Sequence, residues 1–590
     1  MKKLILINSQ QELDYVNQKK KYKDYLKLIL QPEIEIKEDK KILFLEKFKS
    51  KNFFKASIFF RNKLDNVLKK INIKLIKYFN LPNINFITYY GNHLKSLINV
   101  VIFHQDAINN LIKKNKIKHV VLFKYVNNND NLDNFYLDIV KSLKIEIKIN
   151  FIKLNIKDNT IIKKKFSNLV PSYIDEKFSI KREFINQIKI KNISKKNKQN
   201  LLFTNYSKNM QNIAKILSAK FNIIFYDKIF FRYTSINQNQ SSLNSFVNIL
   251  KKENSIYNEF IFYKNFQTAD IVMNFIQEKI NEIININLFH FNKINYILKK
   301  YKLSGIISEY ETNKTIQICD QSKYKVINLF FSHGGTAGHY LNWPQVNIYN
   351  RDYHKNIFYQ AFSKKIKNYL LKNFRRIKRK PINLLTLPNI DHLKYKNIKK
   401  IKKNSKKIKI AYFCTTYSGN YESKVGIHDD YKLYLLREKI KKKIIESRNI
   451  QLNVKPGYNN RNIKIKFLNG YDSNISYYKD DYPNEKIFEE NDIIVCEVNS
   501  TTMVEALYTN LPIIIFKKDY PKFLNISKKL LKNRILFLNK EKDILKTFDK
   551  IDNNPKKIST NFNKDFIKLY YNIKNLNIEH IKLRLYRLFS

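Results

Sequence analysis

Short apolar runs separated by longer segments with helical spacing are the feature that most constrains the fold of this chain. Runs such as 119–126, 201–206 and 222–226 have the length and composition of strands. Between them, segments such as 62–79 and 275–284 carry apolar residues three and four positions apart, as one face of a helix does. Strands that alternate with helices favour a sheet covered by helices. The sequence therefore predicts an α/β fold.

The chain is long enough for several domains. Its 590 residues, 44% of them hydrophobic, can bury two to four cores at about 100–200 residues per domain. Its composition changes at 394–409, where nine of sixteen residues are Lys, as in an exposed linker. The predicted organisation is an N-terminal α/β domain with helical insertions, a linker, a second Rossmann-like domain and a helical tail: 1–393, 394–407, 408–540 and 541–590.

The formal charge of +61 raises the question of an anionic partner. Lys, Asn, Ile, Phe and Tyr are abundant while Gly and Pro are scarce, a bias that an AT-rich genome produces without any ligand. The lysines are mostly dispersed, and neither paired zinc-ligand spacings nor an RRM-type aromatic signature occurs. Nucleic acid is therefore not expected as the partner, and a basic nucleic-acid-binding protein stays an alternative.

The cysteines and the apolar segments indicate a cytoplasmic protein. Cys319, Cys414 and Cys496 are too few and too far apart for a disulfide framework or a Cys-based zinc site, and no metal or cofactor is expected. The amino terminus has only four consecutive apolar residues, and no stretch approaches the ~18 that a transmembrane helix needs. Peripheral contact with an anionic membrane at its inner face is left open.

The first candidate site is a loop that holds three of the nine glycines of the chain, within 334–338. It follows the apolar run 326–331, and carboxyl ends of strands are where open α/β sheets bind ligands. Glycine allows close backbone approach to a ligand, and an imidazole suits a general base. We predict His333 as the catalytic residue; a tight turn with a hydrogen-bonded His is the alternative. The predicted substrate contacts are Gly334, Gly335, Gly338 and His339.

The second candidate site, within 492–507, combines an apolar strand, a hydroxyl-rich turn and a helix start. Free N–H groups at a helix start bind phosphate, and hydroxyls add donors. Glu505 has two interpretations: it reaches a ribose diol, or it closes a capping box that begins at Thr502. The predicted phosphate ligands are Ser500, Thr501 and Thr502.

Two further residues are candidates for donor binding. Thr415 begins a polar loop after the first strand of the second domain, and Lys455 ends the next strand. The alternative for Thr415 is an ordinary turn, and the alternative for Lys455 is that it is one more Lys in a Lys-rich chain. Six isolated histidines are interpreted as packed or surface residues: His93, His104, His119, His290, His392 and His580.

The order of these motifs resembles that of surface-carbohydrate transferases with the GT-B fold and their relatives, the CDP-glycerol glycerophosphotransferases. The resemblance is best over 330–516, from the His-Gly loop to "Ser-Thr-Thr…Glu-Ala-Leu…Asn-Leu-Pro-Ile-Ile". It implies two Rossmann-like domains facing across a cleft, with helical additions in the N-terminal part and the tail. By this resemblance His333 lies on the acceptor side, and Ser500, Thr501 and Glu505 contact the nucleotide phosphates and ribose.

The chain departs from these relatives at two turns. It reads Glu497-Val498-Asn499-Ser500-Thr501 where they have an acidic-Tyr-Ser-Ser or Pro-Ser-Thr turn, and its Lys455-Pro456-Gly457 lacks their His.

The expected function is transfer of a sugar or polyol phosphate in surface polysaccharide biosynthesis. The donor would be nucleotide-activated, and the acceptor a carbohydrate or a lipid-linked molecule. A nucleotide-sugar 2-epimerase of the same fold, which needs no acceptor, is an alternative.

Overall fold

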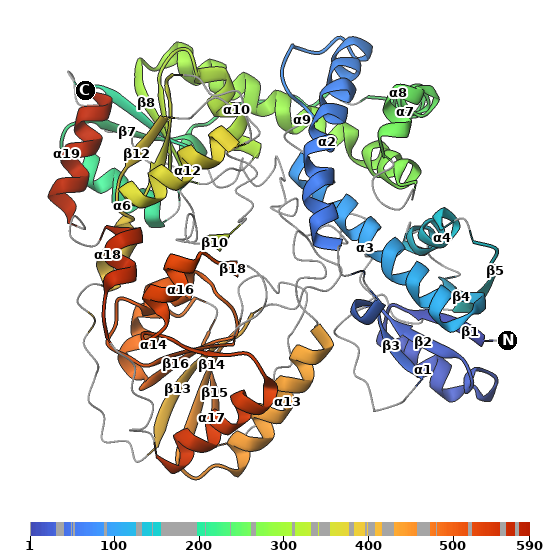
Figure 1. Ribbon diagram of the computed structural model, residues 1–590. Coiled ribbons are helices and arrows are strands. Elements are labelled where there is room, and N and C mark those ends of the chain that lie inside the picture. Colours follow the sequence, from blue (N-terminus) through green and yellow to red (C-terminus); the bar gives the residue numbers. More distant parts are fainter. Residues whose placement is uncertain are drawn as a thin grey trace. The chain divides into compact units, whose positions relative to one another are not determined.

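The fold is described from a computed structural model of the chain (Figure 1). The chain forms two compact units. Unit 1 comprises 1–182, 233–289 and 417–434, and unit 2 comprises 183–232, 290–416 and 435–590. The structure describes residues 2–30, 41–48, 50, 53–87, 91–125, 132–143, 145–154, 198–206, 208–236, 238–260, 267–309, 313–331, 340–341, 355–376, 383–395, 398, 407–415, 430–456, 473–479, 481–516, 522–554, 562–572 and 577–590.

Unit 1 contains a five-stranded parallel sheet in the order β3-β2-β1-β4-β5. Its strands are β1 (Lys2–Ile7), β2 (Leu26–Ile29), β3 (Ile42–Phe44), β4 (Ile117–Tyr125) and β5 (Lys148–Leu154). Helix α1 (Gln10–Gln18) begins where the Ser9 side chain accepts a hydrogen bond from the N–H of Glu12. The Glu12 carboxylate accepts in turn from the N–H of Asn8, so side chains of this segment satisfy backbone N–H groups at the helix start.

Helices account for much of the remaining described part of unit 1. They are α2 (Phe53–Tyr78), α3 (Gly91–Asn115), α4 (Leu132–Ser142), α7 (Gln240–Lys252), α8 (Asn254–Tyr257) and most of α9 (Ala269–Lys300). Buried Asp106 on α3 accepts from the N–H and the hydroxyl of Ser50, at 2.7 and 2.8 Å, and so fixes the chain before α2. One apolar core joins these helices to one face of the sheet.

Unit 2 contains two parallel sheets of six strands. The first has the order β12-β11-β9-β8-β6-β7. Its strands are β6 (Asn200–Phe203), β7 (Asn222–Phe225), β8 (Leu303–Glu309), β9 (Ile327–Phe331), β11 (Ile357–Ala361) and β12 (Asn383–Thr386). Its helices include α6 (Lys208–Leu217), α10 (Asn313–Ser322) and α12 (Lys364–Arg376).

The second sheet of unit 2 has the order β15-β14-β13-β16-β17-β19. In chain order this is 3-2-1-4-5-6, the order of dinucleotide-binding Rossmann folds. The strands are β13 (Ile408–Phe413), β14 (Ile450–Lys455), β15 (Ile475–Tyr477), β16 (Ile493–Cys496), β17 (Ile513–Phe516) and β19 (Leu536–Leu538). The helices are most of α13 (Asp430–Glu446), α14 (Asn484–Glu490), α15 (Thr501–Ala506), α16 (Asn525–Leu531) and α17 (Glu541–Asn553).

The helical tail of the chain returns to the first sheet of unit 2. Helix α18 (Asp565–Tyr571) contacts α12 and α16, and α19 (Ile578–Phe589) packs on α6 (Figure 1). The Phe589 ring covers Gly305 of β8, where an added Cβ would lie 2.2 Å from a ring carbon. Gly305 is therefore required by close packing.

The α/β class, the Rossmann-like sheets and the helical tail are confirmed. The structure adds a third parallel sheet, within the first 154 residues, to the two Rossmann-like domains that the sequence predicts. Apolar periodicity finds strands, but it carries no information on which strands share a sheet. The predicted linker 394–407 falls within unit 2.

Candidate functional site

The strand order of the second sheet of unit 2 points to a candidate binding edge. β13 and β16 are neighbours, and the chain proceeds from them toward opposite ends of the sheet. Ligands of open α/β sheets bind beyond the carboxyl ends of such strands. The chain leaves β13 through Cys414 and Thr415, and it leaves β16 through Glu497 and the turn 498–500 before α15.

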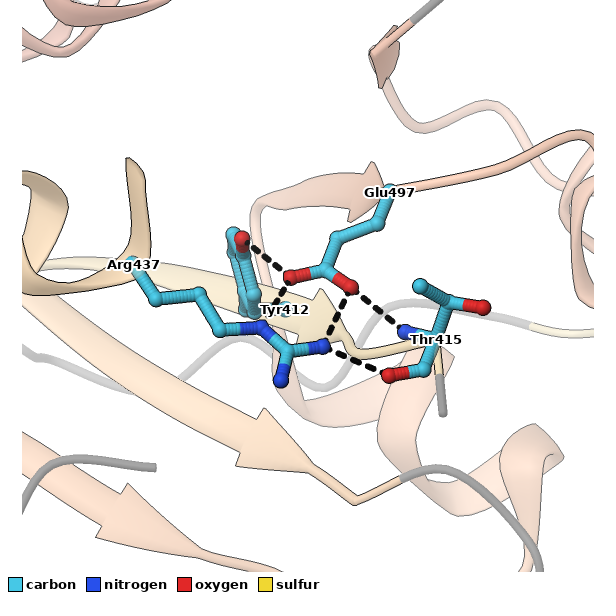
Figure 2. Close-up of polar contacts among 4 residues, drawn as sticks. All are labelled: Tyr412, Thr415, Arg437 and Glu497. Atoms are coloured by element: carbon cyan, nitrogen blue, oxygen red, sulfur yellow. Dashed lines mark hydrogen bonds and ion pairs between the residues drawn. The ribbon is translucent and has the colours of Figure 1, made fainter. Parts of the chain in front are cut away.

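A buried ion pair joins these two strand ends (Figure 2). Arg437 of α13 and Glu497 are 1% and 0% exposed. The guanidinium donates from Nε to Oε1 at 2.8 Å and from Nη2 to Oε2 at 2.7 Å. The Tyr412 hydroxyl donates to Oε1 at 2.7 Å, and the Thr415 N–H donates to Oε2 at 2.6 Å. Arg437 Nη2 also donates to the Thr415 carbonyl at 2.5 Å, so Thr415 is held through its backbone.

The protonation states around this ion pair follow from burial. Burial, and next the charge of Glu497, raise the pKa of the Tyr412 hydroxyl well above its ordinary value. The same two causes raise the pKa of the Cys414 thiol. A thiolate is the reactive form of cysteine, so Cys414 is an inert packed residue.

The hydroxyl-rich turn begins helix α15. Ser500 is the N-cap residue, with extended backbone (φ −130°, ψ 179°), and its side chain makes no capping hydrogen bond. Ser500, Thr501 and Thr502 are all partly exposed. The capping-box interpretation of Glu505 is wrong, because the cap lies at Ser500 and not at Thr502. The Glu505 carboxylate bonds elsewhere.

Glu505 connects α15 to two other segments. Its Oε2 accepts from Asn484 Nδ2 of α14 at 2.7 Å, and it is hydrogen-bonded to the hydroxyl of Tyr395 at the end of η7 (Ile390–Tyr395). The residue keeps some accessible surface, but its carboxyl is closely surrounded by protein. Burial raises the pKa of this carboxyl to about 7, against the lowering effects of Asn484, Lys394 and Tyr395.

The end of the same helix is fixed by Arg534, which is fully buried. Its guanidinium donates to the carbonyls of Thr509 at 2.8 Å and Leu511 at 3.0 Å. Burial lowers the pKa of Arg534 to about 10. These contacts hold the Asn-Leu-Pro turn between α15 and β17.

Lys455 lies at the carboxyl end of β14, as predicted, but its ammonium is directed at backbone. Nζ donates to the carbonyls of Lys479 at 2.6 Å and Tyr482 at 3.1 Å, and the residue is 8% exposed. A buried cation held on carbonyls stabilises the segment before α14. A diphosphate at Lys455 would compete with these contacts.

The structure thus brings Thr415 and the turn before α15 to one edge and ties them together. The His-Gly loop, with His333, Gly334, Gly335, Gly338 and His339, lies outside the described residues. Sequence reasoning missed Arg437 and Tyr412, and it noted Glu497 only as a departure from the family pattern. An acidic residue directly after the wholly apolar strand 493–496 was the signal available for Glu497.

Three of the isolated histidines are packed residues, as predicted. His392 Nδ1 lies 3.0 Å from the Tyr508 hydroxyl, and burial lowers the pKa of this imidazole to about 3. His290 Nδ1 lies 3.0 Å from the hydroxyl of buried Tyr226. His104 Nδ1 lies 2.8 Å from the carbonyl of Val100. These rings are structural.

No group of three or more His, Cys, Asp or Glu side chains in the described part of the chain is arranged to hold a metal ion. None of the described helices has both the length and the apolar character needed to cross a bilayer.

No protein-family model matches the chain, and no curated protein sequence matches it significantly. Among solved structures, S. aureus MnaA in a co-structure with UDP is 13% identical; the match covers 66% of this chain and 97% of that one, with a TM-score of 0.38. UDP-GlcNAc 2-epimerase from Neisseria meningitidis, bound to UDP-GlcNAc, is 11% identical, with coverage of 66% and 100% and a TM-score of 0.38. The glycosyltransferase SnogD from Streptomyces nogalater is 9% identical, with coverage of 66% and 94% and a TM-score of 0.30. The structural similarity to glycosyltransferases and UDP-GlcNAc 2-epimerases is therefore distant.

Proposed function

We propose that this protein is a transferase that moves a sugar or polyol phosphate from a nucleotide-activated donor to a carbohydrate or lipid-linked acceptor. The observation that carries the proposal is the edge at β13 and β16. A sheet with the strand order of dinucleotide-binding folds presents a partly exposed, hydroxyl-rich turn there. Serine and threonine hydroxyls donate hydrogen bonds to phosphate oxygens.

In this proposal the donor phosphates lie at Ser500, Thr501 and Thr502, beside Thr415. Glu505 is the candidate ribose contact, and a ribose diol would compete with Asn484 and Tyr395 for its carboxylate. Lys455 is the candidate diphosphate contact. The cleft between two Rossmann-like domains, which the motif resemblance implies, remains part of the proposal.

The acceptor side rests on the motif resemblance. His333 would take the proton of the attacking acceptor hydroxyl as its oxygen bonds to the transferred group and the bond from that group to the nucleotide phosphate breaks, so that the nucleotide leaves with the bonding electrons. His339 and the three loop glycines would lie at the acceptor. A surface polysaccharide or its lipid-linked precursor is the proposed acceptor class, and anionic membrane is a proposed surface for peripheral contact. Helix α12 contains no acidic residue and exposes Lys364, Lys372 and Arg375.

The test measures donor turnover by the purified chain with a panel of UDP-, CDP- and GDP-activated sugars and CDP-glycerol, with and without acceptor. His333→Ala is expected to lower turnover by about 10²–10⁴-fold, the usual contribution of a general base. His580→Ala is the matched control, since the backbone N–H of His580, not its ring, makes the capping bond to Asn577.

Two outcomes of this measurement would contradict the proposed function or the role of His333. Turnover that needs no acceptor and inverts the sugar at C2 would replace the transferase by a 2-epimerase. Equal turnover by His333→Ala and His580→Ala would remove the role assigned to His333.

A further inference from the structure

The carboxylate of Glu497 is fully occupied by protein donors. Oε1 accepts from Tyr412 and from Arg437 Nε, and Oε2 accepts from Thr415 N–H and Arg437 Nη2. Four donors use the acceptor sites that a carboxylate offers. Glu497 therefore has no lone pair left for a substrate, a metal ion or a transferred proton.

The ion pair connects three separate segments of unit 2. Glu497 follows β16 and lies three positions before Ser500; Arg437 lies on α13; and Thr415 follows β13. Arg437 Nη2 contacts both the Glu497 carboxylate and the Thr415 carbonyl. The planar guanidinium and carboxylate fix direction as well as distance, so the two strand ends are set relative to each other.

Stability is a poor explanation for this arrangement. Removing two charges from water costs about as much as their attraction returns, and apolar replacements of buried ion pairs are often neutral or stabilising. Geometry is what a bidentate pair supplies beyond apolar packing. The geometry here concerns Thr415 and the start of α15, where the proposed donor phosphates lie.

We propose that Arg437 and Glu497 are positioning residues that hold Thr415 and the 498–500 turn in the arrangement that binds the nucleotide donor. This inference rests on the proposed function for the identity of the ligand. Whether Arg437 and Glu497 hold these segments in place is a property of the protein alone, and it can be measured without a ligand.

The main variant is Arg437→Lys, which keeps the positive charge but cannot bridge Glu497 and Thr415 in a bidentate manner. Tyr412→Phe is the matched control, because it removes one buried hydrogen bond from the same carboxylate but none that reaches Thr415. If Arg437→Lys does not accumulate in folded form, Glu497→Gln takes its place. It keeps acceptor capacity for the Thr415 N–H and removes the charge opposite Arg437.

The first measurement is amide hydrogen exchange without ligand. In Arg437→Lys, peptides that cover 413–415 and 497–502 are expected to exchange about tenfold faster, with the rest of unit 2 unchanged, while Tyr412→Phe leaves these peptides near wild type. A tenfold change corresponds to about 1.4 kcal/mol. Equal exchange in the two variants, or faster exchange spread over the whole sheet, would overturn the inference.

The second measurement is the Kd of ADP, CDP, GDP and UDP for each protein. The nucleotide that binds wild type is expected to bind Arg437→Lys about tenfold more weakly and Tyr412→Phe about equally. Equal weakening in both variants would reduce Arg437 to a purely structural residue. If Arg437→Lys shows faster amide exchange only in 413–415 and 497–502, and the wild-type protein binds none of the four nucleotides, the positioning of these segments is supported and the proposed donor is rejected.

Discussion

Glu505 carries a proton under conditions in which an ordinary glutamate is ionised. Burial raises the pKa of its carboxyl from 4.5 to about 7. Between these values the folded chain keeps a proton that the unfolded chain has lost, so the free energy of unfolding falls as pH rises from about 4.5 to 7. About one pH unit above 7 the loss is complete and amounts to about 3 kcal/mol.

Glu505→Gln should remove this dependence, because a glutamine cannot ionise and its carbonyl can still accept from Asn484. We expect the variant to be more stable than wild type above pH 7 and equal to it near pH 4.5. Urea unfolding across pH 4.5–8.5 measures the difference. Glu541→Gln, at a half-exposed glutamate that pairs with Lys439, is the control and should follow the wild-type profile. Parallel profiles for wild type and Glu505→Gln would show that Glu505 does not titrate in this window.

Single residues also show where sequence reasoning stops. The strand before Glu497 could be predicted because its apolar run is local. The partner of Glu497 could not be predicted, because Arg437 lies among Lys residues on α13 and a solvent-exposed helix face would have the same sequence pattern. Lys455 was placed correctly at a strand end, but its acceptors are backbone carbonyls, which every sequence offers.

At the scale of elements, the docking of α19 depends on the absence of a side chain on β8. A Cβ at Gly305 would lie 2.2 and 2.3 Å from two Phe589 ring carbons, and that ring is buried with Ile581 and Leu585. Gly305→Ala should therefore destabilise the chain by about 1–3 kcal/mol through overpacking. Phe589→Ala should cost about 3–5 kcal/mol through loss of the ring.

The double variant Gly305→Ala/Phe589→Ala tests whether the two residues act on each other. We expect its destabilisation to be smaller than the sum of the single values, since the new methyl group occupies space that the ring has left. Denaturant unfolding of the four proteins gives this cycle. Leu583→Ala, on the exposed side of α19, should change little. Additive losses would mean that Phe589 does not pack on Gly305.

The sequence predicts elements in proportion to how local their signal is. The runs now seen as β4 and β7 were expected within a residue or two, because period and composition are properties of neighbours in the chain. The predicted run 201–206 extends three residues beyond the end of β6. No pattern of neighbouring residues predicts that Phe589, in the last helix, covers a glycine of β8, or that strands of the first 154 residues form their own sheet. Such pairings are decided by packing between distant segments.

At the scale of the whole molecule, the charge of +61 should oppose compactness. Lys and Arg number 111 against 50 Asp and Glu, so the average charge pair in the folded chain is repulsive. Added salt shortens the Debye length from about 30 Å at 0.01 M to about 10 Å at 0.1 M and screens this repulsion. We expect the Tm to rise as NaCl is increased from about 10 to 300 mM, measured by scanning calorimetry.

The identity of the anion separates general repulsion from a built anion site. Screening depends on ionic strength alone, so chloride, acetate and fluoride should raise the Tm equally at matched ionic strength. A nucleic-acid-binding protein would instead gain stability from a short RNA or DNA duplex at low salt, and this gain would fall steeply as salt increases. Equal effects of the three anions on the Tm, together with no gain from either duplex, would leave codon usage as the source of the charge. A Tm that does not rise with salt would instead show that the basic residues are already neutralised within the fold.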